Sequence, residues 1–280
     1  MPLINRQASS LAAVFSGARA IRDAWNPGRD APEEIWFRGQ PKRQFTLSPG
    51  LYRAEARDSG YDELALYHAF ASLGHAYTIQ KPTNDWEWYF VAQHHGLPTR
   101  LLDWTESLLA AVYFAVEPIW RSLSKRDLVS GPARRQPLFD DDSPVVWVVD
   151  AGSINLMSHG QDCIFAPPKP ELASYLPRHL LKRSPAGAFK PKGPTALFPP
   201  RQTTRIIAQQ GMFTVHGRDE TPIDTLARRR GSTIKLGCIT LDRSALSSII
   251  DELILAGITK LALFPDLDSV AAHVKWQYAE

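Results

Sequence analysis

The run of residues 35–40 (IWFRGQ) is the first segment of the chain that could do chemistry. Arg38 follows β-favouring residues and precedes Gly39, so its guanidinium fork could hold a phosphate where the glycine lets the backbone come close. Gln40 adds an amide that could support the same contact. The alternative use of Arg38 is an ion pair with an acidic neighbour that only stabilises the fold.

Residues 93–105 (QHHGLPTRLLDWT) form a second polar segment, which lies between two hydrophobic stretches. Its side chains supply hydrogen-bond donors and acceptors, positive charge and a carboxylate: His94, Thr99, Arg100, Asp103 and Thr105. Functional groups concentrate on loops that rigid elements hold, so this segment favours a binding cleft. We expect Arg100 to line that cleft, and Asp103 to orient Arg100 or a histidine or to act as a base.

Each of these side chains also has a structural interpretation. Arg100 and Asp103 could pair with each other and orient the loop. Thr105 could cap the following helix, with Glu106 in its first turn. His94 could be a hydrogen-bonded histidine of the core.

Gln209 and Gln210 precede Gly211 and form the third polar motif. Two amides with paired donors and acceptors can bind a base edge or a carboxamide. The alternative is a β-bulge or an edge turn whose glutamine side chains are only solvated.

The sequence has no Walker loop, GxGxxG, HExxH or GxSxG motif. These motifs are typical of nucleotide-binding loops, zinc proteases and serine hydrolases. Adjacent side chains on a helix point apart, so His94 and His95 make a poor metal pair. Asp266 is expected to cap a helix, with metal binding as its functional alternative. Our leading interpretation therefore includes no metal.

Several helices and strands must position these motifs. Apolar residues on helical spacing predict helices over residues 11–25, 61–77, 85–94, 107–117, 244–256 and 266–278. Apolar runs predict strands over residues 35–40, 145–149, 206–207, 212–215, 234–241 and 261–264, with an irregular segment over 99–103. Pro118 is expected to end or kink its helix. We predict one α+β domain with a central mixed or antiparallel sheet flanked by helices.

The domain is expected to span residues 31–280, with residues 1–30 forming an N-terminal helix that packs on it. Residues 118–144 and 167–203 carry many prolines and charges and are predicted to be loop excursions. Neither predicted boundary coincides with a linker between two independent cores.

Composition bounds the class of protein. Of 280 residues 44% are hydrophobic and 22% charged, which excludes a disordered chain. The net charge of +3 permits a nucleotide or nucleic-acid ligand without demanding one. Two cysteines without CxxC spacing favour a reduced, cytoplasmic setting. The longest apolar stretch, residues 108–116, is far shorter than the roughly 20 residues of a membrane span.

Taken in order, the motifs resemble the FRG domain family, which is bacterial and phage-associated. The resemblance rests on residues 37–40, 93–105, 111–115, 205–213, 256–258 and 263–268, and it extends over roughly 35–272. A weaker similarity links the same order of motifs to ADP-ribosyltransferases. That similarity implies an ADP-ribosyltransferase-like fold and NAD as the substrate.

The ADP-ribosyltransferase resemblance also implies roles for individual residues. Arg38 matches the strand residue that holds NAD, supported by Gly39 and Gln40, while Thr99, Arg100 and Thr105 belong to the second motif. Gln209 or Gln210 stands where these enzymes usually have a glutamate that orients the nicotinamide ribose. A neutral amide can bond to a ribose hydroxyl but carries no carboxylate charge.

The leading hypothesis is an NAD-binding ADP-ribosyltransferase-like enzyme that acts as a toxin or antiphage effector on a protein or nucleic-acid acceptor. Its catalytic candidates are His94, Asp103, Gln209 and Gln210. One alternative is a metal-dependent nucleic-acid-processing enzyme with His94, Asp103, Glu106 and Asp266 at its site. Another is a non-catalytic sensor of nucleotides or nucleic acids that uses Arg38, Arg100, Arg205 and the basic segments 121–135 and 228–230.

Overall fold

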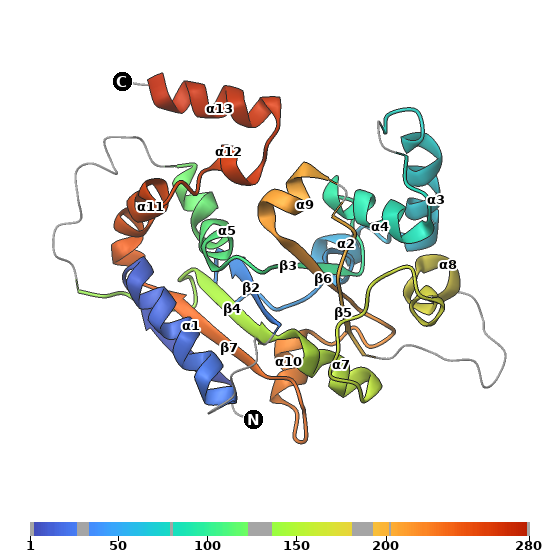
Figure 1. The fold of residues 1–280 in the computed structure, drawn as a ribbon, viewed down its shortest axis with the longest axis horizontal. Coiled ribbons are helices and arrows are strands. Elements are labelled where there is room, and N and C mark those ends of the chain that lie inside the picture. Colours follow the sequence, from blue (N-terminus) through green and yellow to red (C-terminus); the bar gives the residue numbers. More distant parts are fainter. Residues whose placement is uncertain are drawn as a thin grey trace.

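The protein folds around one mixed sheet of seven strands in the order β1-β7-β4-β2-β3-β6-β5, as the computed structural model shows (Figure 1). The structure describes residues 3–26, 34–78, 81–122, 136–180, 193–201 and 203–278. The strands are β1 (Ile4–Ala8), β2 (Ile35–Gln40), β3 (Leu101–Thr105), β4 (Val145–Asp150), β5 (Thr195–Leu197), β6 (Gly211–Val215) and β7 (Leu236–Leu241). β1 is parallel to β7, whereas the other pairs are antiparallel, so the expected α+β class is confirmed.

Helices cover both faces of the sheet. They are α1 (Leu11–Trp25), α2 (Ala54–Asp58), α3 (Glu63–Gly74), α4 (Asp85–His94), α5 (Leu108–Trp120), α7 (Ala151–His159), α8 (Pro177–Leu180), α9 (Thr204–Gln209), α10 (Ile223–Arg228), α11 (Leu246–Leu255), α12 (Lys260–Leu263) and α13 (Leu267–Tyr278). Three short 3₁₀ turns complete the described elements: η1 (Gly50–Tyr52), η2 (Pro170–Tyr175) and η3 (Arg243–Ala245).

Strand β4 explains why an unbroken apolar run suits the middle of this sheet. Its six residues are all buried. Val146 and Val148 face the core shared with α1, α5 and α11, while Val145 and Val149 face the core shared with α7 and α10. Side chains alternate along a strand, so a strand with helices on both faces needs apolar residues at every position.

Helix α5 lies directly against β2, and Gly39 makes that contact possible. A Cβ atom added to Gly39 would lie 1.9 Å from the carbonyl oxygen of Ala111 and 2.5 Å from the backbone nitrogen of Ala115. No side chain fits in that space. Gly39 is therefore required for the packing of α5 on β2. The sequence had suggested that a ligand comes close to the backbone here, but the backbone of α5 occupies that place.

Three short segments differ from the sequence-based expectations. Residues 99–103 were expected to be irregular, but Leu101–Thr105 is a strand paired with β6 and, at one residue, with β2. Residues 206–207 lie in helix α9, because the Thr203 hydroxyl caps it by accepting from the nitrogen of Ile206. Residues 261–264 were expected to be a strand, but Lys260–Leu263 is a helix.

The bounds of several predicted segments also differ from the structure. Pro118 lies inside α5, which continues to Trp120, since a proline in the last turn removes little of the helix. Residues 4–8 precede the expected N-terminal helix and add edge strand β1 to the sheet. Part of the expected 167–203 excursion forms β5, and residues 123–135 of the 118–144 excursion lie outside the described residues.

Among the helices described, none is long and apolar enough to span a lipid bilayer.

Candidate functional site

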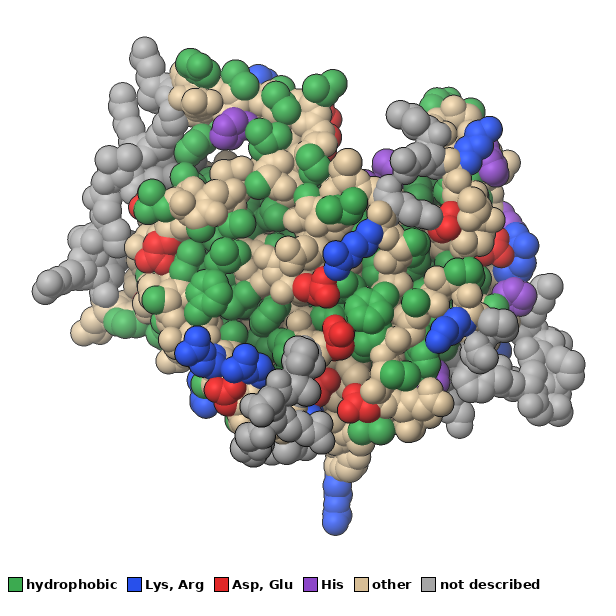
Figure 2. All heavy atoms as spheres, in the orientation of Figure 1, with side chains coloured by type: hydrophobic (Ala, Val, Ile, Leu, Met, Phe, Trp, Pro, Cys, Tyr) green, Lys and Arg blue, Asp and Glu red, His purple; other side chains and the backbone are tan. Residues whose placement is uncertain are grey.

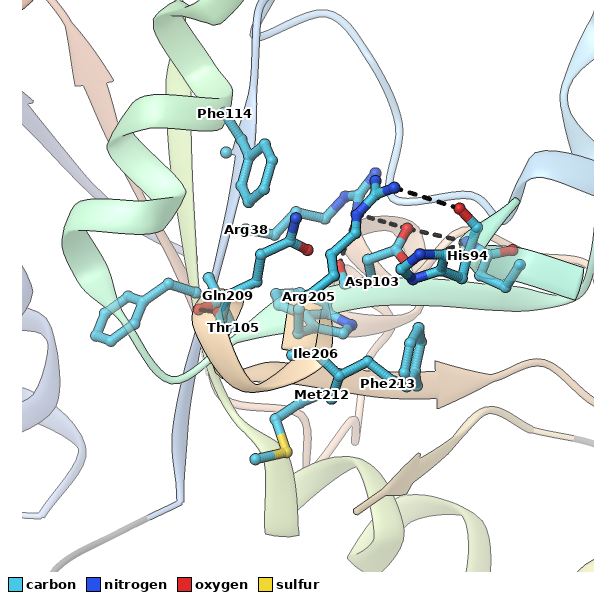
Figure 3. A pocket seen from close by; sticks show the side chains of 15 residues that line it. Arg38, His94, Asp103, Thr105, Phe114, Arg205, Ile206, Gln209, Met212 and Phe213 are labelled. Carbon is cyan, nitrogen blue, oxygen red and sulfur yellow. Dashed lines mark hydrogen bonds and ion pairs between the residues drawn. The ribbon is translucent and has the colours of Figure 1, made fainter. Parts of the chain in front are cut away.

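A cavity of about 310 Å³ opens where β2, β3 and β6 meet helices α4, α5 and α9 (Figure 3). Its lining combines polar and aromatic side chains: Arg38, Gln93, His94, Asp103, Thr105, Phe114, Arg205, Gln209 and Phe213 are among them. The volume is at the lower end of the roughly 300–1,000 Å³ typical of small-molecule sites. All three polar motifs predicted from the sequence contribute residues to this cavity.

Arg38 extends from β2 into the cavity with part of its guanidinium unpaired. Its Nη1 atom donates to the carbonyl oxygen of Asp103 at 2.6 Å and lies 3.7 Å from a carboxylate oxygen of the same residue. Its Nε atom is buried and has no hydrogen-bond partner among the described residues. Burial lowers the pKa of Arg38 to about 10, so the group remains charged at neutral pH. A buried cation with an unused donor is suited to an anionic ligand.

Asp103 is held by Gln93, a residue that the sequence analysis did not select. The Gln93 Nε2 atom donates to both carboxylate oxygens of Asp103 at 3.2 and 3.0 Å. Thr99 donates to the other end of the same amide at 2.5 Å. Asp103 therefore contacts Arg38 and Gln93, where an interaction with Arg100 or a histidine had been expected. Its side chain is 55% exposed and remains accessible to a ligand.

Arg205 brings a second cation to the cavity from helix α9. Its Nη1 atom donates to the carbonyl oxygen of His94 at 3.4 Å, and its guanidinium lies 4.5 Å from the ring centroid of Phe264. Burial, with the charge of Arg205 next in effect, lowers the pKa of His94 to about 4. His94 is therefore neutral at pH 7, and the arginines supply the positive charge of the pocket.

Thr105 and Gln209 fix the far wall of the cavity. Thr105 donates from its hydroxyl to the carbonyl oxygen of Gln209 at 2.6 Å. The side-chain amide of Gln209 donates to the carbonyl oxygen of Leu263 at 3.1 Å. Ser107, two residues after Thr105, is the N-cap of α5. Thr105 thus links β3 to α9 and does not cap the helix itself.

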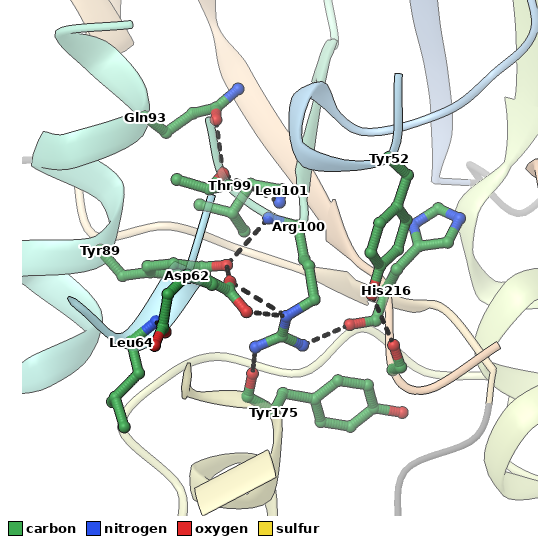
Figure 4. A network of polar contacts seen from close by, with 12 residues as sticks. Tyr52, Asp62, Leu64, Tyr89, Gln93, Thr99, Arg100, Leu101, Tyr175 and His216 are labelled. Atoms are coloured by element: carbon green, nitrogen blue, oxygen red, sulfur yellow. Dashed lines mark hydrogen bonds and ion pairs between the residues drawn. The ribbon is translucent and has the colours of Figure 1, made fainter. Parts of the chain in front are cut away.

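Arg100 does not line this cavity, contrary to expectation. It is 1% exposed, and its Nε atom donates to both carboxylate oxygens of Glu63 at 3.0 and 2.8 Å. The Nη atoms donate to the carbonyl oxygens of His216 and Tyr175 (Figure 4). These partners compensate the buried charge, so Arg100 stabilises the fold, and its guanidinium is absent from the lining of the cavity that holds Arg38.

Three other predicted residues also fall outside the lining. Thr99 is buried behind Gln93 and positions it. Gln40 is 4% exposed, donates to the carbonyl oxygen of Thr46 and accepts from the indole of Trp147 in the core. Gln210 is an exposed helix C-cap in the left-handed conformation, with φ of 47°. The Gln40 amide and the Thr99 hydroxyl therefore serve local structure, whereas the Gln210 side chain is exposed outside the cavity.

The residues of the metal-dependent alternative are not assembled. Glu106 pairs with Arg201 at 2.7 Å, and Asp266 caps helix α13 by accepting from the nitrogen of Ser269 at 2.7 Å. Neither lines the cavity that holds His94 and Asp103. Within the described part of the chain, no group of three or more histidine, cysteine, aspartate or glutamate side chains could hold a metal ion.

The basic segments of the sensor alternative give little support to a nucleic-acid surface. Residues 228–230 are exposed at the end of α10, where Arg229 approaches Asp219 at 3.4 Å. Most of segment 121–135 lies outside the described residues. On the face drawn in Figure 2, lysine and arginine side chains are scattered beside acidic ones and form no single stripe.

The fold and the cavity define an α+β protein with a partly unpaired arginine in a ligand-sized pocket. Residues 33–122 match the model of the FRG domain, and the resemblance identified from the motifs is confirmed for these residues. None of the curated proteins and none of the solved structures matches the chain. The matched residues include Arg38, His94 and Asp103, whereas Arg205 and Gln209 lie beyond them.

Arg205, Gln93 and Phe114 are among the pocket residues that the sequence-based site did not include. Arg205 belongs to the motifs that carry the FRG resemblance, but it was assigned a ligand-binding role only in the sensor alternative. The local pattern did not reveal its place in the pocket, because Arg205 lies in α9, and residues 206–207 of that helix were predicted to be a strand. Gln93 had a signal, since it opens the polar segment 93–105.

Proposed function

We propose that this cavity binds NAD and that the protein is an ADP-ribosyltransferase-like enzyme. The observation that carries the proposal is the Arg38 side chain, which is anchored at one end by Asp103 and has a buried Nε donor without a partner. A diphosphate would satisfy that donor through a charge-assisted hydrogen bond. Arg205 on the opposite element adds a second positive charge to the same pocket.

Aromatic and apolar walls make the cavity suitable for a nucleoside. Phe37, Phe114 and Phe213 line it together with Met212. Flat heterocyclic rings gain from contact with such side chains because both surfaces leave water. A pocket with cations at one side and aromatic rings at the others fits a nucleotide better than a simple anion.

In the proposed reaction, the bond between C1′ of the ribose and the nicotinamide nitrogen breaks, and its electron pair leaves with neutral nicotinamide. The acceptor nucleophile then adds to the cationic ribose carbon and gives up its proton to solvent or to a carboxylate. Asp103 is the carboxylate that lines the cavity, and its negative charge would stabilise the developing cation. Gln209 would bond to a ribose hydroxyl.

Calorimetry with NAD tests the binding step. The wild-type protein should bind NAD, and Arg38→Ala should weaken binding by roughly 10- to 100-fold, the usual worth of a charge-assisted hydrogen bond. Arg38→Lys should recover only part of the affinity because an ammonium lacks the fork. Arg22→Ala on α1, whose side chain is exposed and paired with Asp23, is the control and should bind normally. Equal affinity in Arg38→Ala and wild type would remove the phosphate role of Arg38.

Mass spectrometry of NAD incubated with the protein and cell extract tests the chemistry. Released nicotinamide, together with an ADP-ribose gain on protein or nucleic acid, is the expected result. Asp103→Asn should reduce nicotinamide release far more than it reduces NAD binding. We also propose that the enzyme acts in the bacterial cytoplasm as a toxin or antiphage effector. Growth arrest or phage resistance that depends on Arg38 is the corresponding cellular result.

One observation favours a second candidate, a nucleotide sensor without catalysis. At the position where ADP-ribosyltransferases usually have a glutamate, this chain has Gln209. Its amide donates to the backbone of Leu263 and carries no charge. A protein of this kind would bind NAD through Arg38 and leave it intact. Tight binding without any nicotinamide release would support the sensor and refute the enzyme.

A further inference from the structure

A second cavity, of about 430 Å³, adjoins the first at Arg38. Arg38, Gln93 and Asp103 line both cavities. The second one extends under η1 and α2, and its other walls include Arg53, Ser59 and Tyr61. The arginine with the unpaired Nε atom therefore lies at the junction of two hollows.

The second cavity offers a cation and an aromatic ring to a nucleotide, next to the carboxylate of Glu55 in the same wall. Arg53 is exposed; its Nε atom donates to the carbonyl oxygen of Ser48 at 3.3 Å, which aligns the guanidinium along the wall. Its positive charge is close enough to contribute to the lowered pKa of Arg38. Tyr61 is 47% exposed, so its ring is available for stacking.

A backbone hydrogen bond joins η1, which contributes Gly50 to the wall of this cavity, to the segment before β3. The nitrogen of Leu51 in η1 donates to the carbonyl oxygen of Thr99 just before β3 at 3.1 Å. The same residue, Thr99, holds Gln93 through its hydroxyl. One short segment thus positions both the wall of the second cavity and the amide shared by the two cavities.

From this arrangement we infer that the cavity lined by Arg53 and Tyr61 is a second subsite of one extended ligand site. The ligand is a dinucleotide whose diphosphate lies at Arg38 and whose two nucleosides occupy the two cavities. The inference rests on the proposed function for the choice of NAD as the dinucleotide. It adds that the first cavity alone takes only half of the ligand, in agreement with its small volume.

Calorimetry with three ligands tests the inference: NAD, AMP and nicotinamide mononucleotide. Arg53→Ala and Tyr61→Ala should each weaken NAD binding about tenfold, which corresponds to about 1.4 kcal/mol. They should weaken one of the mononucleotides similarly and leave the other unchanged. Arg38→Ala should weaken all three ligands, because the phosphate contact is common to them.

Arg57 lies in α2, four residues after Arg53, and provides a matched control. It is exposed and paired with Glu220 at 2.5 Å, and it does not line the second cavity but a neighbouring one, to which Tyr61 also contributes. Arg57→Ala should bind all three ligands as the wild type does. Tyr61→Phe keeps the ring and should retain more NAD affinity than Tyr61→Ala. Both test positions are exposed, so thermal unfolding of the variants should match the wild type.

Each contrary result has its own meaning. If NAD binds the wild type and Arg53→Ala equally well, the second subsite is refuted and the proposed function stands. If Arg53→Ala raises only the KM for an acceptor, the cavity belongs to the acceptor and the inference is also refuted. If Arg53→Ala weakens both mononucleotides, the division into two subsites is wrong. If the wild type fails to bind NAD, both proposals fall.

Discussion

Removal of the Glu63 carboxylate is the sharpest test of how Arg100 is used. Glu63 is 6% exposed and accepts both bonds from the Arg100 Nε atom, as well as the hydroxyl of Tyr89. Glu63→Ala would leave a guanidinium that is 1% exposed with two backbone carbonyls and no counter-charge. Breaking a buried pair in this way costs about 3–5 kcal/mol.

That cost is a large part of the roughly 5–15 kcal/mol that stabilises a typical domain. In urea unfolding followed by circular dichroism, with a slope of about 3 kcal/mol per molar, the midpoint should fall by about 1–2 M. Glu220→Ala is the control, because the Arg57–Glu220 pair is exposed at 56% and 53%. Its loss should change stability by about 0–1 kcal/mol.

A second variant separates the charge from the hydrogen bonds. Glu63→Gln keeps an acceptor for Arg100 and should be destabilised less than Glu63→Ala. It should also bind NAD as the wild type does, since Arg100 does not line the cavity. If Glu63→Ala is no less stable than Glu220→Ala, the buried pair does not carry the stability assigned to it. Arg100 would then have to be reconsidered as a ligand residue.

Three further changes test local features of the fold. Gly39→Ala should destabilise the protein by about 3 kcal/mol or more in the same urea assay, because the new Cβ would lie 1.9 Å from the Ala111 carbonyl oxygen. Gly50→Ala is the control: the atom nearest to its new Cβ is 3.8 Å away, so stability should change by less than about 1 kcal/mol. Gln210→Gly should raise the melting temperature, with a gain of about 1 kcal/mol from relief of its positive φ, and should not alter NAD affinity. Burial lowers the pKa of His216 to about 4, so the unfolded chain binds a proton that the folded chain excludes between pH 6.5 and 4. The free energy of unfolding should therefore fall by up to about 1.4 kcal/mol per pH unit as pH drops through that window. His216→Leu should remove this contribution to the pH dependence of stability. An unchanged pH dependence in the variant would contradict the lowered pKa of His216.

Much of the candidate site was predictable because its residues stand out locally. Arg38, His94, Asp103 and Thr105 are polar side chains that interrupt or end apolar segments, and all four line the cavity. Arg100 has the same local appearance, yet it is buried in an ion pair. Its partner Glu63 lies 37 positions away, so no local pattern distinguishes the two arginines.

The secondary structure likewise divides into elements that local sequence predicts and elements that depend on distant residues. The amphipathic pattern of residues 11–25 and the cap at Ser10 are local properties, and the helix forms there as expected. Strand β3 and the edge strand β1 exist only through pairing with distant strands, β6 in one case and β7 in the other. Propensity over a few residues contains no information about such partners.

The sequence alone therefore determined the α+β class, the FRG resemblance and the set of polar motifs, because periodicity and residue type are encoded over short distances. The tertiary structure decided which of those motifs share a cavity. It brought Arg205 and Gln93 to Arg38, and it removed Arg100, Gln40 and Gln210 from the site. The physical reason is that a buried charge or amide must be hydrogen-bonded, and its partners are often residues far away in the sequence. Local sequence patterns do not show which distant residues come into contact.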